Sequence, residues 1–158
     1  MTYRVRLRPV KAGDLPQIEP WYAEALAAAY TERSLEQRFA DAKTAGCDLL
    51  AIAGGDGAVR GLLDYRLNDP ADGWLTTVLI AMAAGQRGWG YGSEAMRLLE
   101  SRHRNARFHA RIDPRNGLAL YFWLRLGYRP ARPDEVFWRV PNDGGIIAMI
   151  RDSGSHPG

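Results

Sequence analysis

The chain has 158 residues and a formal net charge of +3; 46% of its residues are hydrophobic and 25% are charged. This is the composition of an ordinary globular protein, and we expect one domain over residues 1–151 with a frayed polar tail over 152–158. No apolar run is long enough for a membrane span and no signal-peptide pattern is present, so we expect a cytoplasmic protein without a membrane partner. The single cysteine excludes an internal disulfide and a cysteine metal cluster, and we expect no metal.

The basic charge balance, with an isoelectric point of about 9.2, raises the question of nucleic-acid binding. The arginines are scattered except over residues 101–107, which we expect to form the C-terminal end of a helix. Cations are favoured there by the helix dipole and by solvent. We therefore expect no nucleic-acid partner, and a modest basic excess suits an anionic ligand equally well.

The first part of the chain is expected to form a strand followed by two helices. Apolar and basic residues alternate over 3–10, which predicts a half-buried strand. A helix is expected over 14–30, with a kink or restart at Pro20 because proline has no N–H to donate. A capping-box pattern predicts a second helix over 34–46.

The middle of the chain is expected to form three strands, a helix and a fourth strand. Two strands around a glycine-rich turn are expected within 47–67, and a largely apolar, β-branched strand over 74–82. A helix follows over about 93–103, and then a strand over 106–112.

The last part of the chain is expected to form a buried helix and two strands. Asn116 is expected to cap a helix over 117–126 that Gly127 ends, and strands are expected over 136–140 and 145–151. The element order predicts an α/β (α+β) fold, with a mixed sheet of about seven strands flanked by about four helices. The early hairpins are antiparallel, and the strand–helix–strand passage predicts one parallel pairing.

A glycine-rich segment precedes the third predicted helix, with four glycines within residues 85–92. The N-terminus of a helix offers free N–H groups and the positive end of its dipole, which together bind phosphate oxygens. Glycines let a ligand approach the backbone closely, and Arg87 adds a positive charge. The segment therefore predicts a phosphate-binding turn, with a tight turn that binds no ligand as the alternative.

Two anion-binding patterns fit this segment. Residues 90–95 match the dinucleotide pattern G-x-G-x-x-G/A, and Asp113 follows at the end of the next expected strand. Too few residues follow Asp113 to complete a doubly wound domain, and antiparallel hairpins precede the glycines. The dinucleotide-binding interpretation is therefore disfavoured.

The second pattern carries a resemblance to a known family. Residues 87–92 fit R-x-x-G-x-G and resemble the acetyl-CoA pyrophosphate loop of the GNAT superfamily, the acyl-CoA-dependent N-acetyltransferases. Residues 6–16 look like the opening strand and first-helix start of that family. Residues 87–99 are similar to its branch of ribosomal-protein and aminoglycoside acetyltransferases. Residues 116–128 match its later N-x-x-A…L-G-F/Y helix, and 145–151 look like its last strand.

The resemblance implies a binding site for acetyl-CoA or coenzyme A as co-substrate. It implies that the strand before the glycine segment separates from the next strand and pairs its backbone with the pantetheine amides. Loop amides would bind the pyrophosphate, and the family asparagine would lie beside the pantetheine or the departing sulfur, while also able to cap its helix. The implied residues are Ile80, Ala81, Met82, Arg87, Gly88, Trp89, Gly90, Tyr91, Gly92, Ser93 and Asn116.

The acid and the base that would transfer protons are not assigned by the resemblance. The family often has a tyrosine seven residues after the helix asparagine as the acid for the thiolate, and this sequence has Trp123 there. An indole cannot give up its proton at useful pH, so that role fails at this position. Tyr121 and Asp64 are the remaining candidates, for the acid and the base respectively, although packing and a solvated strand face also explain them.

The family places the acceptor between the first two helices and the later hairpins, which here implies Trp21, Tyr22, Glu24 and Tyr30, with Asp69 and Asp72 on a loop. A helix that packs its aromatic face on the sheet explains Trp21 and Tyr22 equally well. Aromatic faces and a carboxylate suit a cationic amine. The resemblance implies direct transfer in a ternary complex to a primary amine, either a small molecule such as an aminoglycoside or polyamine, or a protein N-terminus or lysine. A CoA-binding module without catalysis is the alternative, and we expect a monomer or homodimer.

Overall fold

A mixed sheet of seven strands runs through the described residues, which are 3–29, 33–43, 47–83, 85–87, 90–138 and 145–151 of this computed structural model. The strand order is β1-β2-β3-β4-β5-β7-β6. The strands are β1 (Val5–Pro9), β2 (Cys47–Gly54), β3 (Val59–Leu67), β4 (Trp74–Met82), β5 (Arg107–Ile112), β6 (Arg129–Pro130) and β7 (Ile147–Arg151). The helices are α1 (Leu15–Ala29), α2 (Leu35–Asp41), α3 (Tyr91–Arg102) and α4 (Gly117–Arg125), with short 3-10 turns η1 (Ala12–Asp14) and η2 (Pro133–Glu135).

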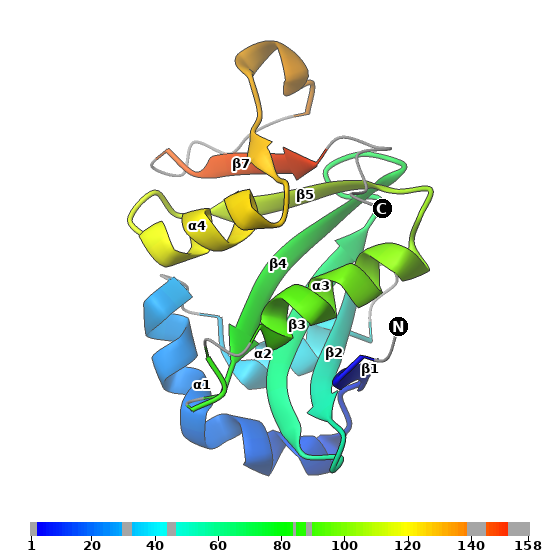
Figure 1. Ribbon diagram of the computed structural model, residues 1–158, viewed down its shortest axis with the longest axis vertical. Coiled ribbons are helices and arrows are strands. Elements are labelled where there is room, and N and C mark those ends of the chain that lie inside the picture. Colours follow the sequence, from blue (N-terminus) through cyan, green and yellow to red (C-terminus); the bar gives the residue numbers. More distant parts are fainter. Residues whose placement is uncertain are drawn as a thin grey trace.

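Helices cover both faces of the sheet, as Figure 1 shows. The alternation along β2 separates two cores: Leu50 and Ile52 belong to the core under α3 and α4, whereas Leu49 and Ala51 belong to the core under α1 and α2. The predicted sheet of about seven strands and four helices is therefore confirmed.

The parallel pairing predicted for the strand–helix–strand passage is confirmed, and it is short. Strands β4 and β5 pair from Trp74–Arg107 to Thr77–Ala110, whereas β4 continues to Met82. Beyond Thr77 the two strands diverge, as Figure 1 shows. Meanwhile β4 pairs with β3 from Leu75 to Met82, apart from one bulged residue, so the opening lies on one side of β4 only.

A β-bulge lies in β4 where the two strands separate. In the antiparallel pairing with β3, Tyr65 opposes Thr77 and Asp64 opposes Leu79, so Val78 is the extra residue. A bulge bends its strand, increases the local twist and shifts the side-chain alternation by one residue. It therefore determines which β4 side chains face the opening.

The shift is visible in the cores that the β4 side chains join. Before the bulge, Leu75 packs toward α3 and α4, and Thr77 Oγ1 donates to Met96 Sδ of α3 at 3.8 Å. After the bulge, Ile80 and Met82 take that face, and Leu79 with Ala81 belongs to the opposite core.

One expectation is wrong and a second is narrowed. The strand predicted over 136–140 is wrong for 136–138, which follow η2 without strand pairing, while 139–140 lie outside the described residues. The partner of β7 on its outer side is the two-residue β6, and the rings of Phe137 and Trp138 pack against Trp74. Of the two alternatives expected at Pro20, the restart is wrong because α1 is continuous through this residue, and the kink stays a prediction.

Smaller differences concern the ends of elements. Helix α3 begins at Tyr91, before the predicted start. Helix α2 ends at Asp41, and residues 44–46 and 152–158, where a helix end and a frayed tail were expected, lie outside the described residues. Among the helices that the structure describes, none combines the length and apolarity needed to cross a membrane.

Candidate functional site

The opening between β4 and β5 forms a cavity of about 420 Å³. Its floor is the β4 segment 77–82, and Ile112 of β5 forms the opposite edge. Helix α4 closes one wall with Ala119, Phe122 and Trp123. The cavity is therefore a direct consequence of the short parallel pairing, because a complete ladder would fill this space with hydrogen bonds.

The first turn of α3 lies at one end of this cavity. Gly90 caps the helix in the left-handed conformation, at φ = 80°, which favours glycine. The first i→i−4 bond runs from Glu94 N to Gly90 O at 3.1 Å, so the N–H groups of Tyr91, Gly92 and Ser93 precede the helical ladder. These N–H groups and the helix dipole make this end attractive to an anion.

Gly92 lies where the first turn of α3 faces α4 and β4. A Cβ at this position would lie 3.4 Å from Phe122 of α4 and 3.8 Å from Ile80 of β4. A side chain here would occupy the passage that leads from the cavity to the helix N-terminus. The structure thus places the predicted residues Ile80, Gly90, Gly92 and Ser93 around one continuous surface.

Arg87 and Glu24 meet at the rim of the cavity. The Arg87 guanidinium donates to Glu24 Oε1 at 3.1 Å, and both side chains are about half exposed. An exposed ion pair contributes little stability, so Arg87 is free to exchange this partner for a ligand phosphate. Arg87, which is predicted to bind acetyl-CoA, and Glu24, which is predicted to bind the acceptor amine, therefore lie side by side.

Asn116 and Trp123 lie on the α4 wall. The Asn116 side chain accepts a hydrogen bond from Ala119 N at 3.1 Å, which confirms the predicted N-cap, and it lines the cavity. Trp123 is buried, and its ring centroid lies 5.1 Å from that of Phe122 and 4.7 Å from that of Tyr128. At the position where the family often has a phenol, this chain has a packed indole without an acidic proton.

The structure brings neither Tyr121 nor Asp64 into the cavity. Tyr121 lies on the exposed face of α4, with 60% of its surface accessible, and Arg125 stacks over its ring. Tyr121 is therefore badly placed to protonate a thiolate, because it faces away from Trp123 and the cavity.

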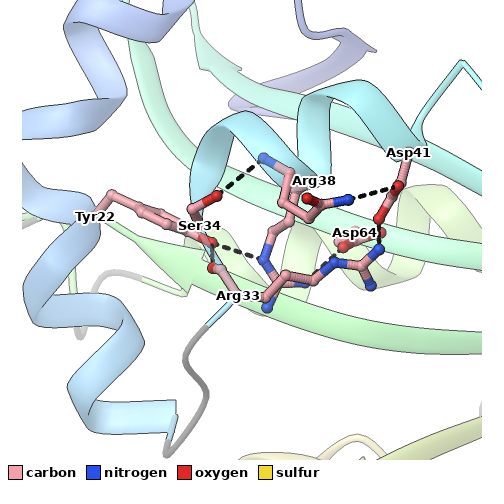
Figure 2. A network of polar contacts seen from close by, with 7 residues as sticks. Tyr22, Arg33, Ser34, Arg38, Asp41 and Asp64 are labelled. Atoms are coloured by element: carbon pink, nitrogen blue, oxygen red, sulfur yellow. Dashed lines mark hydrogen bonds and ion pairs between the residues drawn. The ribbon is translucent and has the colours of Figure 1, made fainter.

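Asp64 belongs to a buried polar network between α1, α2 and β3 (Figure 2). Arg38 Nη1 donates to Asp64 Oδ2 at 2.6 Å, and Arg38 Nε donates to the Tyr22 hydroxyl at 2.7 Å. The Tyr22 hydroxyl in turn donates to the Arg33 carbonyl at 2.6 Å, and burial raises the pKa of Tyr22. These contacts give Asp64 and Tyr22 a structural role in attaching α2 to the sheet.

The remaining acceptor and loop candidates are placed as follows. Trp21 is buried in the core under α1, so Glu24 is the exposed member of the described set, and its neighbour Ala25 lines the cavity. Tyr30, Gly88 and Trp89 lie outside the described residues.

Asp113 is the one carboxylate among the described residues that line the cavity. Its side chain accepts hydrogen bonds from the Arg115 backbone N–H and guanidinium at 2.8–2.9 Å. The Arg115 side-chain and backbone hydrogen bonds lower the pKa of Asp113 to about 2. A carboxylate with such a pKa is a weak base, so it is poorly suited to take a proton from an amine.

Sequence reasoning missed part of the lining. Ala119, Phe122 and Trp123 share one face of α4 by the i, i+3, i+4 rule, a signal that could have identified them once Asn116 was recognised as the cap. Arg111 had no comparable signal, because its position follows from where β5 leaves β4. The described residues include no cluster of three or more histidine, cysteine or acidic side chains that could hold a metal ion.

A mixed sheet whose central parallel strands separate beside a glycine-capped helix is the arrangement that the resemblance to acyl-CoA-dependent acyltransferases implies. A model of the acetyltransferase (GNAT) family matches residues 15–128, and the chain belongs to this family of acetyl-CoA-dependent N-acetyltransferases. A comparison with curated protein sequences found no match.

Solved structures share the fold. An acetyltransferase from Thermus thermophilus is 19% identical, with a TM-score of 0.75 over 94% of this chain and 97% of that one. A spermidine N-acetyltransferase from Vibrio cholerae, solved with CoA and spermine, is 12% identical, with a TM-score of 0.71 over 95% and 97%. The PaiA N-acetyltransferase from Thermoplasma acidophilum, solved with coenzyme A, is 11% identical, with a TM-score of 0.69 over 94% and 99%.

Proposed function

We propose that the protein moves an acetyl group from acetyl-CoA to a primary amine by direct transfer within a ternary complex. The observation that carries this proposal is the separation of β4 from β5 beyond Thr77, which opens a cavity onto the N-terminus of α3. Membership of the acetyltransferase (GNAT) family and the CoA-bound neighbours with the same fold support it.

The donor would lie along the lining already described. On its open side the β4 segment Ile80–Met82 has no strand partner among the described residues, so its backbone would pair with the pantetheine amides as an added strand does. The amides of Tyr91–Ser93, with Arg87 nearby, would hold the pyrophosphate, and Asn116 would lie beside the pantetheine. When bound, acetyl-CoA supplies the activated thioester that the amine attacks.

The chain's own residues position the reactants and leave much of the proton chemistry to water. Among the described lining residues, Asp113 is a weak base and Trp123 cannot donate a proton, so the attacking amine group must lose its proton to water before it reacts. A thiolate is a tolerable leaving group, since a free thiol has a pKa of about 8.5. This sparse proton machinery is also what favours the alternative, a CoA-binding module with weak or no catalysis.

The acceptor side favours a cationic amine. Glu24 places an exposed carboxylate at the rim, and Ala25 brings α1 to the same cavity as α4. The spermine in the Vibrio cholerae neighbour belongs to that protein, and it motivates polyamines as the first acceptors to try here. Aminoglycosides and peptides with a free N-terminus or lysine complete the panel.

The test is release of free thiol from acetyl-CoA by the purified protein with each amine of the panel. We expect amine-dependent thiol release for at least one acceptor, above the slow hydrolysis without amine. CoA binding without turnover on any amine would favour the binding module. Absence of both binding and turnover would contradict the proposal.

Direct transfer has a sharper test, because the chain has a single cysteine, Cys47. A mechanism through a cysteine acyl-enzyme would lose its nucleophile in Cys47→Ala. We expect Cys47→Ala to retain kcat within about threefold and initial-rate lines for the two substrates to intersect. Parallel initial-rate lines together with an inactive Cys47→Ala variant would refute the ternary-complex route.

A further inference from the structure

Arg60 of β3 contacts the glycine segment 85–92 at two points, one near each end. Near the first end, Arg60 Nη1 donates a hydrogen bond to Gln86 Oε1 at 2.6 Å. Near the second end, the central carbon of the Arg60 guanidinium lies 5.2 Å from the centre of the Tyr91 ring, in the first turn of α3. The Arg60 carbonyl also accepts a hydrogen bond from Ala83 N at 2.7 Å, just after β4 ends. One residue of β3 therefore joins both ends of this turn to the sheet.

The direction of the Arg60 side chain results from a β-bulge. In the pairing of β2 with β3, the consecutive residues 52–53 oppose the two neighbours of Arg60, which is therefore the extra residue. In a regular strand Arg60 would share a face with Leu62, which belongs to the core under α1 and α2. The bulge re-aims Arg60 toward Tyr91, which packs against the opposite core.

The Arg60 side chain is packed against its neighbours. Only 25% of its side-chain surface is exposed, and a Cβ on Gly54 of β2 would overlap it. Its carboxylate neighbour, Asp56, is exposed and lies farther away than Gln86, with 3.7 Å between Oδ1 and Nη2. A loose, exposed ion pair does not explain this placement, whereas the contacts with the glycine segment do.

A second arginine, which directly precedes β1, contacts the same tyrosine ring. The guanidinium carbon of Arg4 lies 4.7 Å from the centre of the Tyr91 ring, and Arg4 Nε donates to Glu94 Oε1 at 3.2 Å. Two guanidinium groups beside one ring restrict where the first turn of α3 can lie relative to the sheet. The amides of this turn are thereby placed before a ligand arrives, which reduces the ordering cost of binding.

We propose that Arg60 is a positioning residue for the donor: by joining Gln86 to Tyr91, it keeps the first-turn amides of α3 oriented toward the phosphate oxygens of coenzyme A. This inference rests on the proposed function, and it gives Arg60 no contact with the ligand. A turn that adopts its binding conformation for only a fraction of the time lowers the affinity by that fraction. Loss of Arg60 therefore weakens CoA binding without removing a group that touches CoA.

The test measures CoA affinity by isothermal titration calorimetry. We expect Arg60→Ala to bind CoA about tenfold more weakly, as a turn that is competent about one tenth of the time predicts. Arg60→Lys keeps the charge but lacks the planar fork that bonds Gln86 while facing the ring, and we expect it to stay at least about fivefold weaker than wild type. Arg6→Ala is the matched control, because Arg6 is exposed on β1 and its loss changes the net charge equally. We expect the control to change the affinity less than about twofold.

Gln86→Ala completes a double-mutant cycle with Arg60→Ala. Alone it is expected to weaken CoA about fivefold, and added to Arg60→Ala it is expected to weaken CoA less than about twofold further, because the bond is already lost. In the ligand-free Arg60→Ala protein, the amides of Tyr91–Ser93 should exchange with deuterium faster than in wild type, and saturating CoA should restore the slow exchange. A general loss of stability would not confine faster exchange to this turn.

Three results would overturn the proposal: unchanged CoA affinity of folded Arg60→Ala, wild-type affinity of Arg60→Lys, or additive losses in the cycle. The second would reduce the role of Arg60 to its charge, and the third would show that Arg60 and Gln86 act separately. Failure of the wild-type protein to bind CoA would instead refute the proposed function. Urea unfolding of each variant separates lost binding from lost folding.

Discussion

At the scale of single residues, Thr76 and His109 form a buried polar contact between β4 and β5. The Thr76 hydroxyl donates to the Asp69 carbonyl at 2.5 Å, so its oxygen accepts the Nδ1–H of His109 at 2.8 Å. The rings of Trp74 and Trp138 lie beside the imidazole. Burial, with a smaller effect from the Arg111 charge, lowers the pKa of His109 to about 4.

The lowered pKa predicts a pH-dependent stability. The unfolded histidine binds a proton below its ordinary pKa of about 6.5, whereas the folded one stays neutral until about pH 4. The contribution of neutral His109 to the free energy of unfolding is therefore complete above pH 6.5. It is lost as the pH falls toward 4, by about 3 kcal/mol in all. Urea unfolding at several pH values should show this loss in the wild type, and a smaller loss in His109→Gln. Identical pH slopes for the two proteins would contradict the assignment.

The buried network of Figure 2 gives a second prediction at this scale. Asp64→Asn removes the negative charge beside the buried Arg38 guanidinium, so we expect the free energy of unfolding to fall by about 3 kcal/mol. Asp72→Asn, at an exposed turn position, is the control and should change it by less than about 0.5 kcal/mol.

The same variant distinguishes structure from catalysis. If Asp64 only anchors α2, the folded Asp64→Asn enzyme should keep its turnover within about threefold at a temperature where it remains folded. A well-folded variant with a thousandfold lower kcat would show that Asp64 takes part in proton transfer after all.

At the scale of elements, β4 illustrates what sequence can and cannot determine. Its bounds and its parallel partner follow from a long β-branched run and the helix behind it. The bulge at Val78 has no local signal, because nearly every residue of 74–82 is apolar or β-branched and suits either face of the sheet. The orientation of Ile80 and Met82 is therefore decided by pairing with β3.

Gly61 of β3 lies opposite Met82 and tests that pairing. A Cβ there would lie 2.7 Å from the Ala81 carbonyl oxygen and 2.6 Å from Met82 Sδ, and the backbone oxygen cannot move without displacing β4. We expect Gly61→Ala to cost about 1–3 kcal/mol in urea unfolding and to weaken CoA binding. Gly55→Ala has open space around the new methyl group and serves as the control. Equal changes of the unfolding free energy and of CoA affinity in the two variants would count against a rigid β3–β4 pairing.

In the α4 region of the candidate site, too, some features could be predicted from the sequence and others could not. The cap at Asn116 and the buried face of the helix were predictable from residue type and spacing. The predicted strand over 136–138 failed because its aromatic residues pack on Trp74 instead of pairing, a choice that depends on distant neighbours. Asp64 was ambiguous for a similar reason, since Arg38 reaches it from another element.

At the scale of the whole molecule, elements from both faces of the sheet meet at one opening. Ala25 of α1 lines the same cavity as Ala119 and Phe122 of α4, although these helices cover opposite faces. The separation of β4 from β5 is what joins the two sides. A donor bound along α3 and α4 and an amine entering past α1 could then meet without a covalent enzyme intermediate.

A crystal structure of the protein with CoA tests the central claim most directly. We predict that the pantetheine lies along β4 at Ile80–Met82, with the sulfur in the opening toward α1 and the pyrophosphate on the amides of Tyr91–Ser93. CoA bound away from this opening, or with its sulfur pointing to bulk solvent, would contradict the account.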